Sequence, residues 1–317
     1  MVKDLVLGFD CGGTKTQVDV AEICTKAELT LSESFSVGSM NVNSAGREGV
    51  LSSLEEAFAL VGPERLSRVG SICFGAAGIS NPLAREVFME GTRRGWMMNG
   101  ILTPFPIPLL IGDHQAALWG AHAGSDGMIL IAGTGSVCCG KKTDSAGTSH
   151  EARAGGYGHL IDDEGSGYAL GRDVLAAVVQ AEDGRIPPTA MRQAVFAKLG
   201  ISSVQELVGF VYGKETTKKD IAALAPILNI GLEAGERAAE EILDRASYEL
   251  CRLVVPVAER LDLTEGYLSF CGSVLTKSPR MAEAVKYKLQ DELPSLKIRE
   301  PLYDAAFGAC LAAVKQV

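Results

Sequence analysis

Two stretches of this chain repeat the same order of elements: a short apolar run, a turn rich in glycine and threonine, and a second run. The first apolar run covers residues 4–10 and leads into the turn at 12–14, and the second covers residues 127–133 and leads into 134–136. Apolar runs that end at glycine are typical of buried strands that enter a tight turn. The repeat therefore indicates an internal duplication of one domain core.

The rest of the chain alternates between strand and helix patterns, which predicts an α/β protein. Residues 1–37 are expected to form a three-stranded antiparallel meander. Further strands are expected at 69–76, 107–112, 127–133, 137–142, 267–271 and 295–299. Helices are expected at 45–61, 115–123, 172–182, 190–199, 219–262, 278–290 and 303–314.

The length of 317 residues suggests two domains, and no proline-rich or low-complexity linker separates them. We therefore expect two lobes hinged around a cleft, one formed by residues 1–117 with 300–317 and the other by residues 118–299. The net charge of −9 argues against a general binder of nucleic-acid backbones. A small anionic ligand remains compatible with this charge, because backbone N–H groups bind phosphate without basic side chains.

The cysteines predict a reducing compartment. Eight are present, mostly in apolar or glycine-rich stretches, with no Cys-x-x-Cys pair and no zinc-like spacing with histidine. Asp4 stands where a signal peptide would have its apolar core, and no apolar run reaches the ~18 residues of a membrane span. We expect a soluble, cytoplasmic protein without membrane partners.

The first turn combines groups suited to a phosphate. Gly12 and Gly13 allow the backbone to turn tightly and present N–H groups to an anion, and Thr14 adds a hydroxyl donor. Asp10, at the end of the apolar run, is suited to hold a hydrated magnesium ion. The segment is neither a Walker loop nor a dinucleotide fingerprint. On these residues alone, a simple hairpin turn is an equally good interpretation.

The second turn, Gly133 to Ser136, repeats this chemistry, so two such turns facing each other are able to grip one polyphosphate. Asp113 follows an apolar run directly, where open α/β folds place reactive groups. A helix N-cap is the better interpretation of Asp113 taken alone, and the two roles are compatible.

Residues 155–167 contain five glycines and three acids, a composition that suits a ligand loop better than a core segment. A calcium loop is disfavoured because the acids are consecutive and cannot all face one ion. The helix that begins near Gly165 offers its N-terminus to an anion. Residues 271–274 place a Gly-Ser step after a strand, which alone reads as an ordinary strand–helix turn.

Taken in order, these motifs resemble the sugar-kinase/actin/Hsp70 ATPase superfamily, and within it the N-acetylglucosamine kinase and BadF/BadG/BcrA/BcrD ATPase branch. The resemblance implies two actin-like (ribonuclease H-like) lobes with mixed sheets flanked by helices, hinged around a nucleotide cleft. The segments that carry the likeness are residues 8–16, 38–44, 75–78, 112–118, 131–136, 155–171, 271–274 and 304–313.

The resemblance also implies roles for individual residues. Asp113 would be the base that takes the proton from the sugar 6-hydroxyl, and Asp10 would position Mg²⁺ through water. The implied phosphate-binding residues are Gly12, Gly13, Thr14, Lys15, Gly133, Thr134 and Gly135. The implied adenosine-binding residues are Gly272, Ser273 and Thr276. The implied sugar-binding residues are Asn41, Asp113, Ser136, Gly156, Tyr157, Gly158 and Asp163.

The chain departs from the resembled pattern at Cys11, where a third glycine is usual, and at Val137, which is polar in some relatives. Tyr157 replaces tryptophan and Asp162 replaces glycine. Because Val137, Tyr157 and Asp162 border the implied sugar pocket, they leave the identity of the sugar open.

The implied activity is phosphoryl transfer from ATP, with Mg²⁺, to an amino sugar. N-acetylglucosamine is the first choice, and N-acetylmuramic acid and glucosamine are alternatives. A second hypothesis is an ATPase activator of the BadF/BcrA type, which would need an iron–sulfur cluster on cysteines of paired subunits. A sugar-sensing repressor would need a DNA-binding segment before the first turn, and only nine residues precede Asp10. We expect a small-molecule partner and no nucleic acid. The sequence leaves the oligomeric state open, and many relatives are homodimers.

Overall fold

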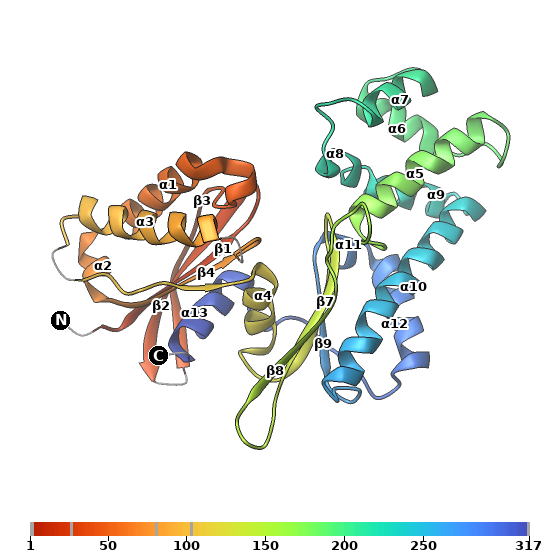
Figure 1. Ribbon diagram of the computed structural model, residues 1–317. Helices are drawn as coiled ribbons and strands as arrows, with labels where there is room; N and C mark the ends of the chain where they lie inside the picture. The colour runs from red at the N-terminus through yellow and green to blue at the C-terminus, as the bar shows by residue number, and fades with distance from the viewer. Residues whose placement is uncertain (1–2, 26–27, 80–81, 102–103, 316–317) are drawn as a thin grey trace. The chain divides into compact units, whose positions relative to one another are not determined.

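The computed structural model describes residues 3–25, 28–79, 82–101 and 104–315. The chain divides into two compact units, residues 1–125 with 301–317 and residues 126–300, hereafter unit 1 and unit 2. Each unit contains one five-stranded mixed sheet (Figure 1). The division falls after helix α4 (Asp113–His122), whereas the sequence placed it at 117/118. The reason is close packing of α4 beyond residue 117, since a Cβ on Gly308 of helix α13 would lie 2.4 Å from the backbone nitrogen of Gly120.

The sheet of unit 1 has the strand order β3-β2-β1-β4-β5. The first three strands form the antiparallel meander expected from the sequence, and β4 and β5 add to β1 in parallel. Its strands are β1 (Leu5–Cys11), β2 (Lys15–Thr25), β3 (Glu28–Gly38), β4 (Val69–Ala76) and β5 (Leu109–Ile111).

Helices cover both faces of this sheet because side chains of β1 alternate between two cores. Phe9 and Phe74 face one core, with ring centroids 4.5 Å apart, together with Leu54 of α1 and Val87 of α3. Val6 faces the other core, with Cys310 of α13. The helices are α1 (Val42–Val61), α2 (Pro63–Arg68), α3 (Pro82–Met98), α4 and α13 (Ala305–Lys315).

The sheet of unit 2 has the order β10-β9-β6-β7-β8, which repeats the topology of unit 1 strand for strand. Strand β6 takes the place of β1, again between an antiparallel partner, β7, and a parallel partner, β9. This agrees with the predicted duplication. The strands are β6 (Gly127–Ala132), β7 (Ser136–Thr143), β8 (Ser149–Gly155), β9 (Tyr267–Cys271) and β10 (Lys297–Ile298).

The region 219–262, expected as mostly helical, is broken into pieces at Pro226 and Gly235, the latter with φ of +68°. Leu250 and Val254 of the long helix α10 pack into the same buried core as Leu130 of β6. The helices of unit 2 are α5 (Gly167–Glu182), α6 (Met191–Leu199), α7 (Val204–Val211), α8 (Lys218–Ala222), a 3-10 turn (Ala225–Ile227), α9 (Leu228–Glu233), α10 (Arg237–Arg260), α11 (Ser273–Thr276) and α12 (Pro279–Glu292).

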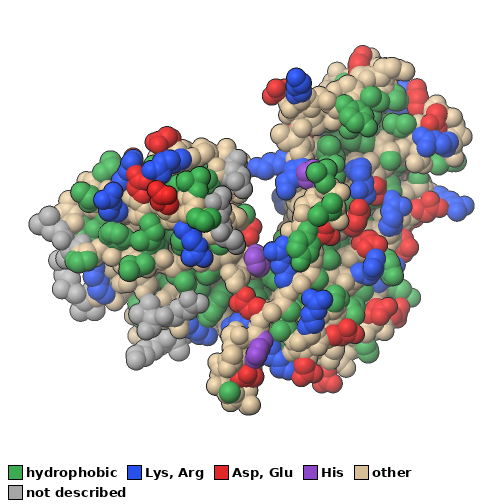
Figure 2. Space-filling model, in the orientation of Figure 1, with side chains coloured by type: hydrophobic (Ala, Val, Ile, Leu, Met, Phe, Trp, Pro, Cys, Tyr) green, Lys and Arg blue, Asp and Glu red, His purple; other side chains and the backbone are tan. Residues whose placement is uncertain are grey.

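In the part of the chain that the structure describes, no single helix is long and apolar enough to cross a membrane. The bent pair α6 and α7 passes that test only when the two helices are joined, by length and composition. On the face drawn in Figure 2, lysine and arginine side chains lie among aspartate and glutamate side chains.

Candidate active site

The turn between β6 and β7 is held by backbone contacts from two other segments of unit 2. The N–H of Gly133 donates to the carbonyl oxygen of Gly135 at 2.9 Å, which closes the turn. Gly272, at the end of β9, has φ of +83°, and a Cβ there would lie 2.4 Å from the Ala132 oxygen. Only glycine allows this approach, so the β9–α11 turn is fixed against the end of β6.

Helix α5 begins beside the same turn. The N–H groups of Gly167 and Tyr168 donate to the carbonyl oxygens of Gly133 and Thr134 at 2.7 and 3.3 Å. Ser166 caps the helix, because its hydroxyl oxygen accepts the N–H of Ala169 at 3.2 Å. These contacts use the first three N–H groups of α5, so the helix favours an anion nearby through the partial positive charge of its N-terminus alone.

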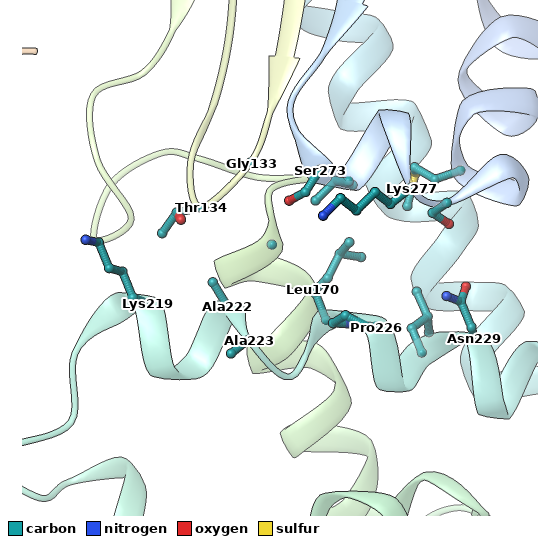
Figure 3. A pocket seen from close by; sticks show the side chains of 16 residues that line it. Gly133, Thr134, Leu170, Lys219, Ala222, Ala223, Pro226, Asn229, Ser273 and Lys277 are labelled. Carbon is teal, nitrogen blue, oxygen red and sulfur yellow. The ribbon is translucent and has the colours of Figure 1, made fainter. Parts of the chain in front are cut away.

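A pocket of about 480 Å³ opens next to this turn, wholly within unit 2 (Figure 3). Thr134 and Ser273 lie along one side, and Ala222 and Pro226 lie along the opposite side. Its lining is mostly apolar with a few polar groups, the usual composition of a small-molecule site. The lining residues are Gly133, Thr134, Gly167, Leu170, Lys219, Ala222, Ala223, Ala225, Pro226, Leu228, Asn229, Ser273, Val274, Lys277, Ser278 and Met281.

The expected adenosine residues occupy different positions around this pocket. Ser273 lines it, and Gly272 shapes its wall through the contact with β6. Thr276 is not among the lining residues, and its hydroxyl donates to the Gly272 carbonyl oxygen at 3.0 Å. Thr276 therefore holds the β9–α11 turn in shape. Lys219 and Lys277, which no sequence motif marked, add cationic side chains to the lining.

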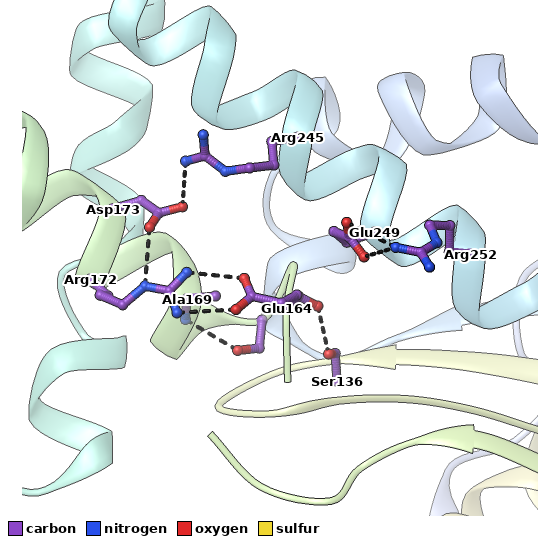
Figure 4. Close-up of polar contacts among 9 residues, drawn as sticks. Ser136, Glu164, Ala169, Arg172, Asp173, Arg245, Glu249 and Arg252 are labelled. Carbon is purple, nitrogen blue, oxygen red and sulfur yellow. Dashed lines mark hydrogen bonds and ion pairs between the residues drawn. The ribbon is translucent and has the colours of Figure 1, made fainter. Parts of the chain in front are cut away.

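A polar network fixes the segment just before α5 (Figure 4). Oδ1 of the buried Asp163 accepts the backbone N–H of Ser136 at 3.1 Å, and the Ser136 hydroxyl donates to the Glu164 carbonyl oxygen at 2.8 Å. Arg172 makes two hydrogen bonds to the Glu164 carboxylate, at 3.1 and 3.0 Å, and a third to Asp173 at 3.1 Å. Two of the expected sugar residues, Ser136 and Asp163, are thus in direct contact.

The other expected sugar residues of unit 2 lie in the loop after β8. Gly156 and Gly158 have φ of +77° and +98°, a backbone conformation that glycine adopts without strain. Tyr157, between them, is 68% exposed. The loop therefore presents an aromatic side chain on a backbone bent by two glycines.

In unit 1, Asp10 and Asp113 lie at the edge of the sheet where its parallel strands have their carboxyl ends. In the parallel register, Asp10 pairs with Gly75, and Gly75 pairs with Ile111, two residues before Asp113. Adjacent strands lie about 4.8 Å apart, so Asp10 and Ile111 are about 10 Å apart across β4. The carboxyl ends of the three parallel strands thus bring both aspartates to one edge.

Asp113 is the first residue of α4 rather than its N-cap, which corrects the N-cap interpretation. Gly112 occupies the cap position, and its N–H donates to the side-chain oxygen of Gln115 at 2.9 Å. Burial opposes ionisation of the Asp113 carboxyl, but hydrogen bonds from the ring and backbone N–H of His114 outweigh it and lower its pKa. The half-exposed Asp113 side chain is therefore a carboxylate at neutral pH.

The Asp10 carboxyl behaves in the opposite way. Burial, followed by the negative charges of Asp113 and Asp304, raises its pKa to about 6. A carboxylate destabilised by neighbouring carboxylates is a natural position for a divalent cation. Among the described residues, no group of three or more His, Cys, Asp or Glu side chains could hold a metal. A magnesium ion here would therefore need water and phosphate oxygens for its other ligands, as Mg²⁺ commonly has.

The first glycine turn is braced by the segment that leads into α1. The hydroxyls of Ser39 and Ser44 donate to the carbonyl oxygens of Gly12 and Gly13 at 3.0 and 3.1 Å. Asn41 stands between these serines, and its carbonyl oxygen accepts the N–H of Ser44 at 3.0 Å. Thr14 and Lys15, on the other side of the turn, are exposed. The structure thus brings Asn41 next to the expected phosphate turn.

Comparison with known proteins identifies the group to which this architecture belongs. The model of the BadF/BadG/BcrA/BcrD ATPase family matches residues 7–313. The chain belongs to the BadF/BadG/BcrA/BcrD ATPase family. Membership of an ATPase family implies the use of ATP, which agrees with the glycine turns and the adjoining pocket.

Relatives of this family member are sugar kinases. An N-acetylmuramic acid/N-acetylglucosamine kinase of Clostridium acetobutylicum is 30% identical over 317 residues, 97% of each chain. An N-acetyl-D-glucosamine kinase of Dictyostelium discoideum is 26% identical over 327 residues, 99% of each chain. A solved structure from Chromobacterium violaceum, provisionally named an N-acetylglucosamine kinase, has a TM-score of 0.68 at 23% identity and covers 97% of this chain and 98% of its own. The likeness to that structure shows the actin-like sugar-kinase fold, with both lobes present.

Proposed function

We propose that this family member is an ATP-dependent amino-sugar kinase that transfers the γ-phosphoryl group of ATP to the 6-hydroxyl of N-acetylglucosamine. The observation that carries the proposal is the pocket of unit 2, in which an apolar floor adjoins a glycine turn and a capped helix N-terminus. This combination suits a nucleotide, whose base is apolar on its faces and whose phosphates are anionic. The named relatives supply the sugar.

In this proposal, unit 2 binds the nucleotide. The adenosine occupies the pocket next to Gly272 and Ser273, and Thr276 acts by keeping their turn in shape. The phosphates extend to the backbone of Gly133, Thr134 and Gly135, where the dipole of α5 favours negative charge. The volume of about 480 Å³ falls within the range of small-molecule sites.

Unit 1 supplies the groups for chemistry. Asp113 accepts the proton of the sugar 6-hydroxyl, a role that requires the ionised form that its contacts with His114 favour. Asp10 would hold Mg²⁺ through water, and the ion would neutralise charge on the transferred phosphoryl group. The phosphate contacts of this unit come from Gly12, Gly13, Thr14 and Lys15. A positioned carboxylate base contributes roughly 10²–10⁴-fold to the rate.

The sugar contacts are assigned to the residues that the family resemblance implies. Asp163 binds Ser136 through Oδ1, so its Oδ2 is the oxygen assigned to a sugar hydroxyl. Tyr157 offers a ring face to the apolar C–H groups of the sugar. The assigned sugar-binding residues are Asn41, Asp113, Ser136, Gly156, Tyr157, Gly158 and Asp163.

A coupled ADP-release assay tests the proposal. The acceptors are N-acetylglucosamine, N-acetylmuramic acid, glucosamine and glucose, with an ATP-only control. The expected result is ADP release that requires an amino sugar and Mg²⁺, with N-acetylglucosamine used best. ADP release at the same rate without any sugar would refute the kinase and favour the ATPase-activator alternative.

Two observations bear on that alternative. Cys138 and Cys139, the adjacent pair on β7, are both buried, and burial raises the pKa of Cys138 well above its usual value. Cluster ligation requires accessible thiolates, so this pair is a poor candidate. Iron analysis of the purified protein checks this point. We further propose that the kinase acts in the cytoplasm as a homodimer, which light scattering of the purified protein tests.

A further inference from the structure

One aromatic side chain of the loop after β8 is held by two charged residues. The backbone N–H of Tyr157 donates to Oδ2 of Asp162 at 2.9 Å. The guanidinium carbon of Arg153 lies 5.1 Å from the centroid of the Tyr157 ring, within the range of a cation–π contact. Tyr157 is therefore anchored through both its backbone and its ring.

The two anchors are themselves fixed by the loop. Nε of Arg153 donates to the Gly155 carbonyl oxygen at 2.9 Å, and Nη2 donates to the Gly156 carbonyl oxygen at 2.6 Å. The backbone N–H of Asp162 donates to the Gly158 carbonyl oxygen at 2.8 Å. The planar fork of arginine makes both of its bonds at once, a geometry that lysine cannot reproduce.

These contacts leave the ring available to a ligand. Tyr157 is 68% exposed although its backbone and one side of its ring are engaged. An exposed aromatic ring that is already ordered binds a ligand without the entropy loss of ordering it first. An open ring face also suits the apolar C–H face of a pyranose.

We propose that Arg153 and Asp162 are positioning residues that hold Tyr157 as a platform for the acceptor sugar. The inference rests on the proposed function and assigns roles to two residues outside the set given above. Asp162 is one of the positions at which this chain departs from the resembled pattern, where glycine is usual. The extra carboxylate supplies the loop with an anchor that glycine lacks.

The contacts are too exposed to be explained by stability alone. Arg153 and Tyr157 lie at the surface, where a charged contact contributes little to the free energy of unfolding. Removing either anchor should therefore leave the fold intact and free the ring. The effect should fall on the affinity for the sugar rather than on that for ATP.

Steady-state kinetics with N-acetylglucosamine and ATP test the inference on D162A, D162N and R153M. Ordering one side chain on binding corresponds to an increase of about 2- to 10-fold in KM for the sugar, expected for D162A and R153M. The KM for ATP, kcat and the thermal midpoint should stay close to the wild-type values. D162N keeps an acceptor oxygen and should restore most of the sugar affinity.

D144A is the matched control. The Asp144 carboxylate also accepts backbone N–H groups in an exposed loop of unit 2, from Ala146 and Thr148 at 2.9 and 2.8 Å. It lies in the β7–β8 turn and has no assigned role in the site. Its loss should leave KM for the sugar unchanged.

Three results would overturn the inference. The first is a sugar KM for D162A and R153M equal to that of D144A. The second is an equal rise of both substrates' KM values together with a lowered thermal midpoint, which would assign the contacts to folding. The third is D162N behaving like D162A. Failure of the wild type to use any amino sugar is a different outcome, which refutes the proposed function and the platform with it.

Discussion

The contact between Gly272 and the end of β6 allows a quantitative test of the nucleotide pocket. Gly272 has φ of +83° and ψ of 153°, and an alanine Cβ would lie 2.4 Å from the Ala132 oxygen. Such a backbone conformation costs a non-glycine residue about 1–3 kcal/mol. Non-bonded carbon and oxygen atoms in ordinary van der Waals contact lie roughly 3.5 Å apart, so the Ala132–Gly133 peptide or α11 must move by about 1 Å.

This displacement should impair ATP use more than it impairs folding. A misplacement of about 1 Å can cost 10²-fold in rate, because the reacting groups lose their alignment. For G272A we expect kcat/KM for ATP to fall by at least about 10-fold, and the free energy of unfolding by about 2–4 kcal/mol. Urea unfolding and the coupled ADP-release assay measure the two quantities.

Gly184 provides the control for backbone strain. It has φ of +80° between α5 and α6, and a Cβ there would meet nothing within 4 Å. G184A therefore introduces a positive-φ cost, about 1–3 kcal/mol, without a collision. It should lose stability and keep kcat/KM for ATP. Equal kcat/KM values in G272A and G184A would refute the argument that the β6 contact shapes the pocket.

Three further predictions concern the carboxylates of unit 1. D113N should lose about 10²–10⁴-fold in kcat while calorimetry shows unchanged binding of ATP and sugar, and a wild-type kcat would exclude Asp113 as the base. D10N should abolish Mg²⁺-dependent turnover yet raise the free energy of unfolding at about pH 7 by about 1–2 kcal/mol, because it removes a partly buried charge. D19N should gain stability in the same way and keep its turnover, since burial also raises the pKa of Asp19 to about 6; urea unfolding that shows no gain in either variant would contradict this. Because the folded pKa of Asp10 (about 6) exceeds the ordinary value of 3.8, its ionisation destabilises the fold as pH rises between these values. The stability gain of D10N should therefore grow between pH 3.8 and about 6 and level off above about pH 6. The apparent Mg²⁺ affinity of the wild type should fall as the pH drops below about 6, because Asp10 becomes protonated. A flat pH profile of either quantity would argue against the assignment.

Strand β8 (Ser149–Gly155) was not predicted, because six of its seven residues are exposed or only partly buried and it has no apolar run. The other strands were predictable from short apolar or alternating runs, several of which end beside a glycine. The helix α3 (Pro82–Met98) was not, since Gly91 and Gly95 interrupt its apolar pattern and normally disfavour a helix. In the structure, Cβ atoms at these two positions would lie 2.2 and 2.3 Å from side-chain atoms of Leu54 and Phe58. The glycines thus permit close packing of α3 on α1, which is a tertiary effect that local propensity does not report.

The candidate site was predictable where its chemistry lies in one short segment, and not where separate segments meet. Gly133 and Thr134 were visible as a turn motif, because glycine and threonine there have a local reason. Lys219 and Asn229 line the same pocket from a region that reads only as helix. Nothing in their local pattern marks them, because only the fold brings them to the turn.

The repeated topology explains how one sheet edge serves two kinds of chemistry. In unit 1, β1 ends with Asp10, and Asp113 follows β5 at the same edge, so acidic side chains collect there. In unit 2, the corresponding β6 ends with Ile131 and Ala132, and its edge adjoins an apolar pocket. Ionised carboxylates would be costly to bury beneath a nucleotide's base, whereas a cation held at the acidic edge would offset their repulsion of its phosphates. Under the proposed function, separating the acidic edge from the apolar edge would let one duplicated framework supply the base and cation site in one copy and the nucleotide site in the other.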